Sequence, residues 1–202
     1  MRERKMTEKL GFAVAALMVV LVGGTFSRPA SAAPDESAPV ITPVPSRAYE
    51  VTLEVALAAS PAAVWETITG DISGWWDHRF SERPAAFFID ARPGGGFFEY
   101  FDADGKNGVR HAVVLRAEKE RSLVFEGPLG FLGDAVSVVT NWTLTPISGD
   151  RTRLAARISV SGLDREGNAE ALAGVWHHFL VERLAGYLAA GCRGGAPCAA
   201  FP

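Results

Sequence analysis

The sequence predicts an α+β domain in which a curved antiparallel sheet of seven strands surrounds one long C-terminal helix. Residues 85–160 alternate apolar and polar side chains in short runs separated by Gly-, Pro- and Asp-rich turns, which is typical of consecutive antiparallel strands. Residues 169–190 repeat their apolar side chains with helical spacing. Both elements need an apolar cover, so we expect them to pack against each other.

The predicted helix at residues 169–190 has a wide, aromatic apolar face. At about 100° per residue, His178 and Glu182 fall on the opposite face. Asn168 is placed to cap the N-terminus of the helix and Gly191 to end it. Arg183 is an exception because it projects near the middle of the apolar face. That face consists of Leu172, Trp176, Phe179, Leu180, Leu184, Tyr187 and Leu188.

A first strand at residues 49–57 is expected to precede two short helices. Its apolar side chains alternate with Glu and Thr, as in a half-buried strand. Ser60 and Pro61 have the residue types of a helix cap and a first helical residue. Asp71 is expected to cap the second short helix, which carries two tryptophans.

Six further strands are predicted between residues 85 and 160. An Asp-Gly turn at residues 102–105 is expected to join two of them as a hairpin. A loop at residues 127–131 precedes the last hairpin. The predicted ranges are residues 87–89, 97–101, 108–116, 122–126, 135–144 and 152–160.

The first 32 residues have the pattern of an export signal. Four basic residues precede an apolar run, and Ala30-Ser31-Ala32 matches the small-x-small sequence of a cleavage site. The apolar run is shorter than the roughly 18 residues of a membrane span. We therefore expect cleavage near Ala32 and a periplasmic or secreted protein with no stable membrane anchor after signal removal. A Pro-rich linker at residues 33–47, a domain at residues 48–190 and a Cys-containing tail at residues 191–202 follow.

The charge of the chain argues against nucleic acid as a partner. The net charge is −3. Cleavage after residue 32 removes five basic and two acidic residues, which makes the mature net charge −6. Nucleic-acid and anionic-membrane binding both favour a basic surface instead.

Both cysteines lie beyond the predicted helix, in the sequence CRGGAPC. In an oxidising compartment, a disulfide between Cys192 and Cys198 is the simplest interpretation. The pair has too few neighbouring ligands for a metal site. Because the loop is glycine-rich and terminal, we do not expect it to pack on the domain.

The order of elements and several short motifs resemble the SRPBCC superfamily, which has the START/Bet v 1-like helix-grip fold. The motifs are the Gly-Gly-Phe turn and strand, the Asp-Gly hairpin, Leu-Val-Phe, Trp-Thr-Leu and GVWHHFLVERLAGYL. The nearest branch is named after the activator of the heat-shock-protein-90 ATPase. The resemblance covers residues 48–190 and implies a cavity between sheet and helix. The superfamily includes lipid carriers, binders of hydrophobic ligands, cyclases and chaperone co-factors, so the fold alone assigns no activity. The expected export argues against heat-shock-protein binding here.

Twelve side chains are expected to line that cavity as ligand-binding residues, although the same aromatic side chains would also suit a filled core. Arg183 is the polar member, and its forked donors suit the carboxylate or phosphate of an amphipathic ligand. Alternatively, Arg183 pairs with Glu99 or Asp77, or extends to the cavity mouth. The set is Trp75, Trp76, Phe88, Phe98, Tyr100, Phe125, Trp142, Trp176, Phe179, Leu180, Arg183 and Tyr187.

The histidines do not predict a metal site. His177 and His178 are adjacent and diverge by about 100° on a helix. His178 and Glu182 are better explained as a solvated pair on the outer face. Asp77 and His78 would suit acid–base chemistry at the pocket mouth, but adjacent side chains seldom point the same way. We expect no cofactor and no metal.

Three functions remain open from the sequence. The first is binding of a small hydrophobic or amphipathic molecule in the cavity. The second is an enzyme of lyase, cyclase or hydrolase type that uses cavity groups such as His78, Asp77, Glu99 or His111; strongly shifted pKa values there would favour it. The third is a protein-interaction module, which would require a filled core and an exposed apolar patch.

Overall fold

One sheet of eight antiparallel strands forms the domain in the computed structural model, which describes residues 39, 41–163 and 166–202. Residues Thr42–Pro202 form one compact unit. The order in the sheet is β1-β8-β7-β6-β5-β4-β3-β2, so the first two strands of the chain lie at opposite edges. The strands are β1 (Ser46–Leu57), β2 (Gly70–Asp71), β3 (Ala86–Ile89), β4 (Gly96–Tyr100), β5 (Gly108–Glu118), β6 (Ser122–Gly127), β7 (Val136–Ile147) and β8 (Arg151–Leu163).

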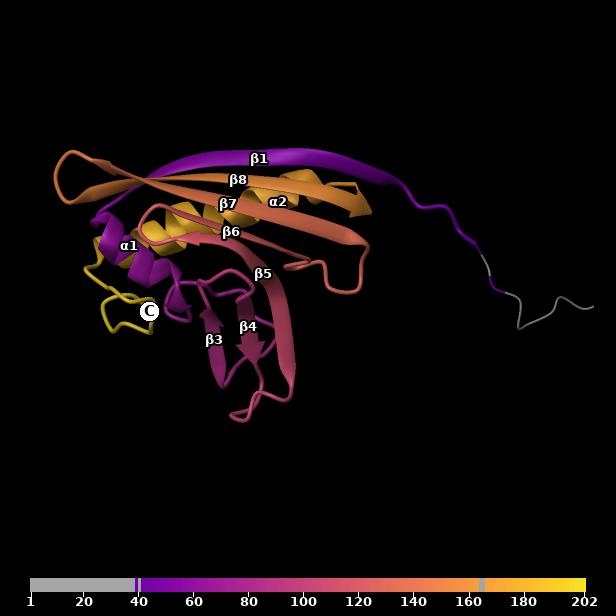
Figure 1. Cartoon of the computed structure of the whole chain (residues 1–202), viewed down its shortest axis with the longest axis horizontal. Coiled ribbons are helices and arrows are strands. Elements are labelled where there is room, and N and C mark those ends of the chain that lie inside the picture. The colour runs from indigo at the N-terminus through magenta and orange to yellow at the C-terminus, as the bar shows by residue number, and fades with distance from the viewer. Residues whose placement is uncertain (1–38, 40, 164–165) are drawn as a thin grey trace, which may run out of the picture. The chain divides into compact units, whose positions relative to one another are not determined.

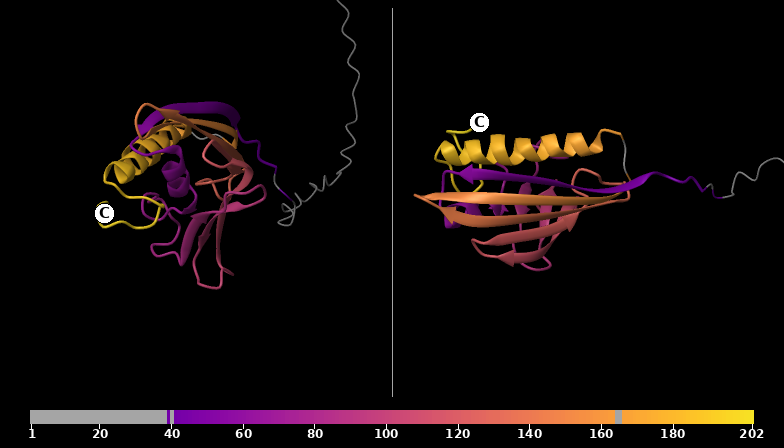
Figure 2. Two further views of the ribbon diagram at one scale, coloured as in Figure 1. Left: turned by 60° about the vertical axis from the view of Figure 1, so that its left-hand side comes forward. Right: turned by 90° about the horizontal axis from the view of Figure 1, so that it is seen from above.

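The sheet curves around a long C-terminal helix (Figures 1 and 2). This helix has three consecutive segments, α2 (Asn168–His177), η1 (His178–Leu184) and α3 (Ala185–Ala189), and lies alongside β1. A shorter helix, α1 (Pro61–Ile68), follows β1. The structure therefore confirms the predicted α+β architecture.

The apolar face of the C-terminal helix is buried against the sheet, as predicted from its spacing. Leu180, Leu184 and Tyr187 have no exposed surface. Trp176 on α2 meets Trp142 on β7 with ring centroids 6.2 Å apart and ring planes nearly perpendicular. Edge-to-face contacts of this kind add to the apolar burial that fixes the helix on the sheet.

The strand count and the second short helix differ from the prediction. Gly70–Asp71 forms an additional short strand, β2, which pairs with β3. The backbone then makes a single turn in which the amides of Trp75 and Trp76 both donate to the carbonyl of Ile72. Gly74 N donates instead to Gly195 O of the tail at 2.8 Å. Because Ile72 N donates to Phe87 O of β3 and Gly74 N donates to the tail, no second helix forms.

The C-terminal helix also departs from an ideal α-helix at two places. Gly167, with φ of 83°, occupies the N-cap position, and Asn168 is the first helical residue rather than the cap. The middle segment is a π-helix, in which Ala185 N bonds to Leu180 O, five residues earlier. A π-turn holds one more residue than an α-turn, so the residues beyond this point depart from the 100° spacing of the prediction, although Leu184, Tyr187 and Leu188 are still buried.

The tail packs on the domain, contrary to the prediction. Cys192 and Cys198 form a disulfide. The hydroxyl of Tyr187 donates to the carbonyls of Arg193 and Ala196. Gly195 lies so close to Asp71 that a Cβ there would overlap the Asp71 carbonyl. Glycine therefore lets the loop reach the β2 edge, a role that the sequence pattern alone did not indicate.

The predicted signal peptide and most of the predicted linker lie outside the described residues. Strand β1 begins at Ser46, two residues inside the linker range. Within the part of the chain that the structure describes, no helix is both long and apolar enough to cross a membrane.

Candidate ligand-binding pocket

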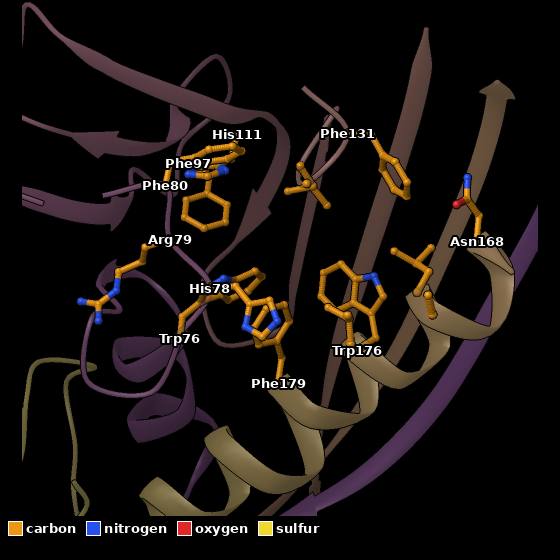
Figure 3. Close-up of a pocket in the computed structure, with 15 residues that line it drawn as sticks. Trp76, His78, Arg79, Phe80, Phe97, His111, Phe131, Asn168, Trp176 and Phe179 are labelled. Carbon is orange, nitrogen blue, oxygen red and sulfur yellow. The ribbon is translucent and has the colours of Figure 1, made fainter. Parts of the chain in front are cut away.

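A pocket of about 330 Å³ opens between the concave face of the sheet and the N-terminal half of the C-terminal helix. The loop between β2 and β3 and the loop between β6 and β7 complete its walls (Figure 3). Its lining is mostly apolar. The lining residues are Trp76, His78, Arg79, Phe80, Phe97, His111, Leu129, Gly130, Phe131, Asn168, Ala171, Leu172, Val175, Trp176 and Phe179.

Trp76 is the centre of the aromatic wall. Its ring stacks on Phe179 with centroids 4.1 Å apart and an angle of 27° between the planes. Phe97 and Trp176 meet the same indole edge-on, at 5.0 and 5.9 Å. These rings hold one another in fixed orientations, so the pocket presents preformed aromatic surfaces.

His111 reaches the pocket because strand β5 carries a β-bulge. Phe97 pairs with Ala112 and Phe98 with Arg110, so His111 is the extra residue. Both His111 and Ala112 are therefore buried, which breaks the strand alternation. Bulges of this kind re-aim a side chain. The imidazole lies between Phe80 and Phe97, with ring centroids 5.6 and 4.6 Å away (Figure 3).

A buried carboxylate fixes His111 and the pocket loop together. Glu99 on β4 has no exposed surface. It accepts hydrogen bonds from His111 Nε2 at 3.0 Å, from Phe80 N at 3.0 Å and from Ser81 N at 2.6 Å. Three donors compensate for the burial of this group. Burial lowers the pKa of His111 below its ordinary value, and the hydrogen bond and charge of Glu99 only partly offset this effect.

A second group of ionisable side chains lies at the pocket mouth. Asp77 contacts His78 Nδ1 at 2.9 Å and His178 Nε2 at 2.8 Å. The other nitrogen of His178 lies 2.9 Å from Glu182. These two carboxylates raise the pKa of His178, with Glu182 contributing most. For Asp77, partial burial raises the pKa, but the hydrogen bonds from His178 and His78 outweigh it and the net pKa is lowered.

Asp77, His78 and His178 are also the one trio of potential metal ligands in the described part of the chain. One ligand atom from each lies within 4.8 Å of the others. Arg183 Nε lies 3.4 Å from Asp77 Oδ2, and His178 already bridges Asp77 and Glu182. Because Arg183 and the hydrogen bond of His178 already occupy Asp77, the arrangement is better described as a network of ion pairs and hydrogen bonds than as a metal centre.

The twelve sequence-predicted ligand residues fall into four groups in the structure. Trp76, Trp176 and Phe179 line the pocket. Arg183 lies outside it: Nε donates to the carbonyl of Trp75, and the guanidinium lies 4.4 Å above the Phe201 ring. The remaining eight are Trp75, Phe125, Trp142, Leu180 and Tyr187, which are buried in the core, and Phe88, Phe98 and Tyr100, which pack together and are partly buried.

The strand parity used for β4 was wrong. Phe97 and Glu99, not Phe98 and Tyr100, are the buried side chains of this strand. A buried carboxylate is tolerated here because backbone amides and His111 satisfy it. The lining residues that sequence reasoning missed come mainly from the loop at residues 127–131, whose two large apolar side chains were the available signal, and from the first turns of α2.

Comparisons with known proteins agree with the architecture. A protein of Rhizobium leguminosarum, uncharacterised in function, is 18% identical with a TM-score of 0.56, over 73% of this chain and 99% of that one. A protein of Rhodobacter sphaeroides is 18% identical with a TM-score of 0.50, over 72% and 99% of the two chains. A protein of Rhizobium loti is 25% identical with a TM-score of 0.48, over 68% and 99%. None of the curated proteins matches the chain.

The first two likenesses show the fold alone, and with the architecture above they support the helix-grip fold. The family model described as "Activator of Hsp90 ATPase homolog 1-like protein" matches residues 58–189, which include strands β2 to β8 and the whole C-terminal helix. The chain therefore belongs to the family of activator of Hsp90 ATPase homolog 1-like proteins.

Proposed function

We propose that this domain binds a small, largely apolar molecule between its sheet and its C-terminal helix. The observation that carries the proposal is the pocket of about 330 Å³ with preformed aromatic walls. The pocket leaves the space between sheet and helix only partly filled, and an apolar pocket bordered by a few polar groups is the usual form of a small-molecule site. The protein-interaction alternative required a filled core and is less favoured for the same reason.

The size and shape of the pocket favour a compact, planar ligand over a long-chain lipid. Its volume is at the lower end of the range of about 300–1,000 Å³ for ligand pockets. Trp76, Phe97 and Trp176 offer ring faces and edges to a flat apolar body.

The polar lining residues favour an amphipathic ligand. His111 supplies a polar group deep in the wall, whereas His78 and Arg79 are exposed at the mouth. The Arg79 guanidinium extends away from the pocket (Figure 3). Arg183 is not part of this proposal because it binds the Trp75 carbonyl and the tail.

Native mass spectrometry of the gently purified protein tests the proposal. We expect an adduct that is lost on denaturation, and quenching of tryptophan fluorescence when anilinonaphthalene sulfonate is added. Ala171→Trp places an indole at the pocket rim and should abolish both signals, whereas the neighbouring Glu170→Trp, outside the pocket, should keep them. No adduct and no quenching in the unmodified protein, even after exposure to a lipid extract, would refute ligand binding.

Acid–base catalysis on the bound molecule is a second candidate. Two histidine–carboxylate pairs, Glu99–His111 and Asp77–His78, border the same pocket. Such pairs orient an imidazole for proton transfer, as general acid–base chemistry requires. If catalysis occurs, a co-purified compound should change mass on incubation with the unmodified protein and remain unchanged with His78→Phe or His111→Phe; an unchanged mass with all three would exclude turnover of that compound.

We also propose that the protein is exported and cleaved near Ala32. The disulfide between Cys192 and Cys198 supports an oxidising compartment. Intact mass measurement of the protein from its native compartment should give a chain that starts close to Ala33. A chain that retains residues 1–32 would contradict cleavage.

A further inference from the structure

We infer that the pocket recognises a phenolic hydroxyl, and that Nδ1 of His111 accepts its hydrogen bond. This inference rests on the proposed function and adds the chemical class of the ligand: a compact aromatic molecule with a neutral hydroxyl group. It depends on three features of the pocket, namely the bulge at His111, the hydrogen bonds of Glu99 and the aromatic surroundings of the imidazole.

The first feature is the placement of a polar ring in an apolar wall. The bulge in β5 turns His111 to the pocket face, where only 5% of the residue is exposed. The rings of Phe80, Phe97 and Phe87 lie 5.6, 4.6 and 5.9 Å from the imidazole, so its nitrogens are set among apolar side chains. A histidine buried to this extent and lining a cavity is suited to bind a ligand group rather than water.

The second feature fixes which nitrogen carries the hydrogen. Each carboxylate oxygen of Glu99 accepts a hydrogen bond from a backbone amide, so both oxygens act as acceptors here. Nε2 of His111 must therefore donate to Glu99. Burial lowers the pKa of His111, so the ring is neutral at physiological pH and has one N–H. The other nitrogen, Nδ1, is then an acceptor, and it has no hydrogen-bond partner within the described residues.

The third feature is the cost of leaving that acceptor unpaired. A ligand that fills the pocket without a hydrogen-bond donor would remove water from Nδ1 and leave this acceptor without a hydrogen bond. Sites of this kind discriminate strongly against analogues that lack the hydroxyl. The surrounding Trp76, Phe97 and Trp176 rings suit an aromatic body, which makes a phenol the donor that fits both requirements.

Other charged groups near the pocket would select a different form of the same ligand. Besides Glu99 on β4, the titratable groups that border the cavity are His78 and Arg79 on the mouth loop, where the Arg79 guanidinium extends away from the pocket (Figure 3); α2 contributes the neutral Asn168. A cation at the mouth would favour a phenolate there. His111 favours the neutral phenol in the interior, so the protonation state of the bound ligand distinguishes the two positions.

A matched pair of probes tests the inference on the unmodified protein. Para-nitrophenol and para-nitroanisole differ only in that the hydroxyl of the first is methylated in the second. We expect the phenol to bind about tenfold more tightly in a calorimetric titration, and its absorption spectrum to be that of the neutral phenol. Its affinity should fall as the pH rises through the ionisation of the phenol, and fall again in acid when His111 is protonated.

A pair of variants assigns the preference to His111. His111→Phe keeps a ring between Phe80 and Phe97 and should make the two probes bind equally, whereas His177→Phe on the outer helix face should leave the preference unchanged. Equal binding of both probes to the unmodified protein would overturn the phenol inference while leaving ligand binding intact. A bound phenolate spectrum would also overturn it. Failure of both probes to bind would count against the proposed function itself.

Discussion

Asp77 and His178 lie 101 positions apart in the sequence and are joined by a contact of 2.8 Å between Oδ2 and Nε2. Asp77 belongs to the loop that carries the pocket residues Trp76 and His78, and His178 begins the π-helical segment. The contact therefore links the loop at the pocket mouth to the C-terminal helix.

The Asp77–His178 contact should make stability depend on pH. Glu182 and Asp77 raise the pKa of His178, so the protonated ring stabilises the folded state in acid and this contribution is lost as the pH rises through the raised pKa. His178→Gln should lower the free energy of unfolding by less than about 1 kcal/mol at about pH 5 and by almost nothing at about pH 9. Urea unfolding at both pH values measures this difference. His177→Gln is the control, and an equal loss at both pH values would contradict the prediction.

Replacing Arg183 should affect stability and leave ligand affinity unchanged. Its guanidinium binds the Trp75 carbonyl and lies over Phe201, and it does not line the pocket. Arg183→Met should cost about 1 kcal/mol in the free energy of unfolding. Anilinonaphthalene sulfonate titration and urea unfolding of the same preparation separate the two effects. Weaker ligand binding at unchanged stability would restore Arg183 to the site.

Removing the carboxylate of Glu99 should loosen the pocket loop. Glu99→Leu leaves the amides of Phe80 and Ser81 without their acceptor and should cost about 3 kcal/mol, whereas Glu99→Gln keeps an acceptor and should cost less. Amide hydrogen exchange at these two residues should accelerate in Glu99→Leu. Equal stability of the Leu and Gln variants would show that these hydrogen bonds do not hold the loop.

Reducing the disulfide should destabilise the domain, because the tail is packed on it. The chain-entropy model gives about 2 kcal/mol for a loop this short. Thermal unfolding with and without a reductant measures the effect, and Cys192→Ala/Cys198→Ala provides a version insensitive to reductant. If the reduced protein unfolds at the same temperature as the oxidised protein, the packing of the tail does not depend on the bond.

The long helix and the hairpins could be predicted because they follow simple periodicities. The burial of Leu172, Trp176, Leu180, Leu184 and Tyr187 repeats with helical spacing, which a single sequence displays directly. The seven expected strands needed only alternation and turn residues. The eighth, at Gly70–Asp71, is too short to alternate and exists because it pairs with β3.

The pocket could not be predicted as well because it depends on departures from those periodicities. The bulge at His111 adds a residue to strand β5, and the sequence around His111 carries no signal that predicts it. Glu99 is an exception to the rule that charged side chains face solvent. Its burial is tolerated because Phe80, Ser81 and His111, which lie outside β4, donate hydrogen bonds to its carboxylate. The wrong parity for Phe98 and Tyr100 on β4 is thus a failure of local reasoning at a strand where distant residues decide.

The π-helical segment at His178–Leu184 has a consequence for how this chain is compared with its relatives. Removing a single residue there would restore ordinary helical geometry, and the residues that follow, including Tyr187 and Leu188, would keep their positions around the axis because the wider turn absorbs the extra residue. A homologue with a purely α-helical terminus would therefore align correctly only with a one-position gap inside a helix. Alignment methods that forbid such gaps would shift the register of the last turns and pair the wrong residues.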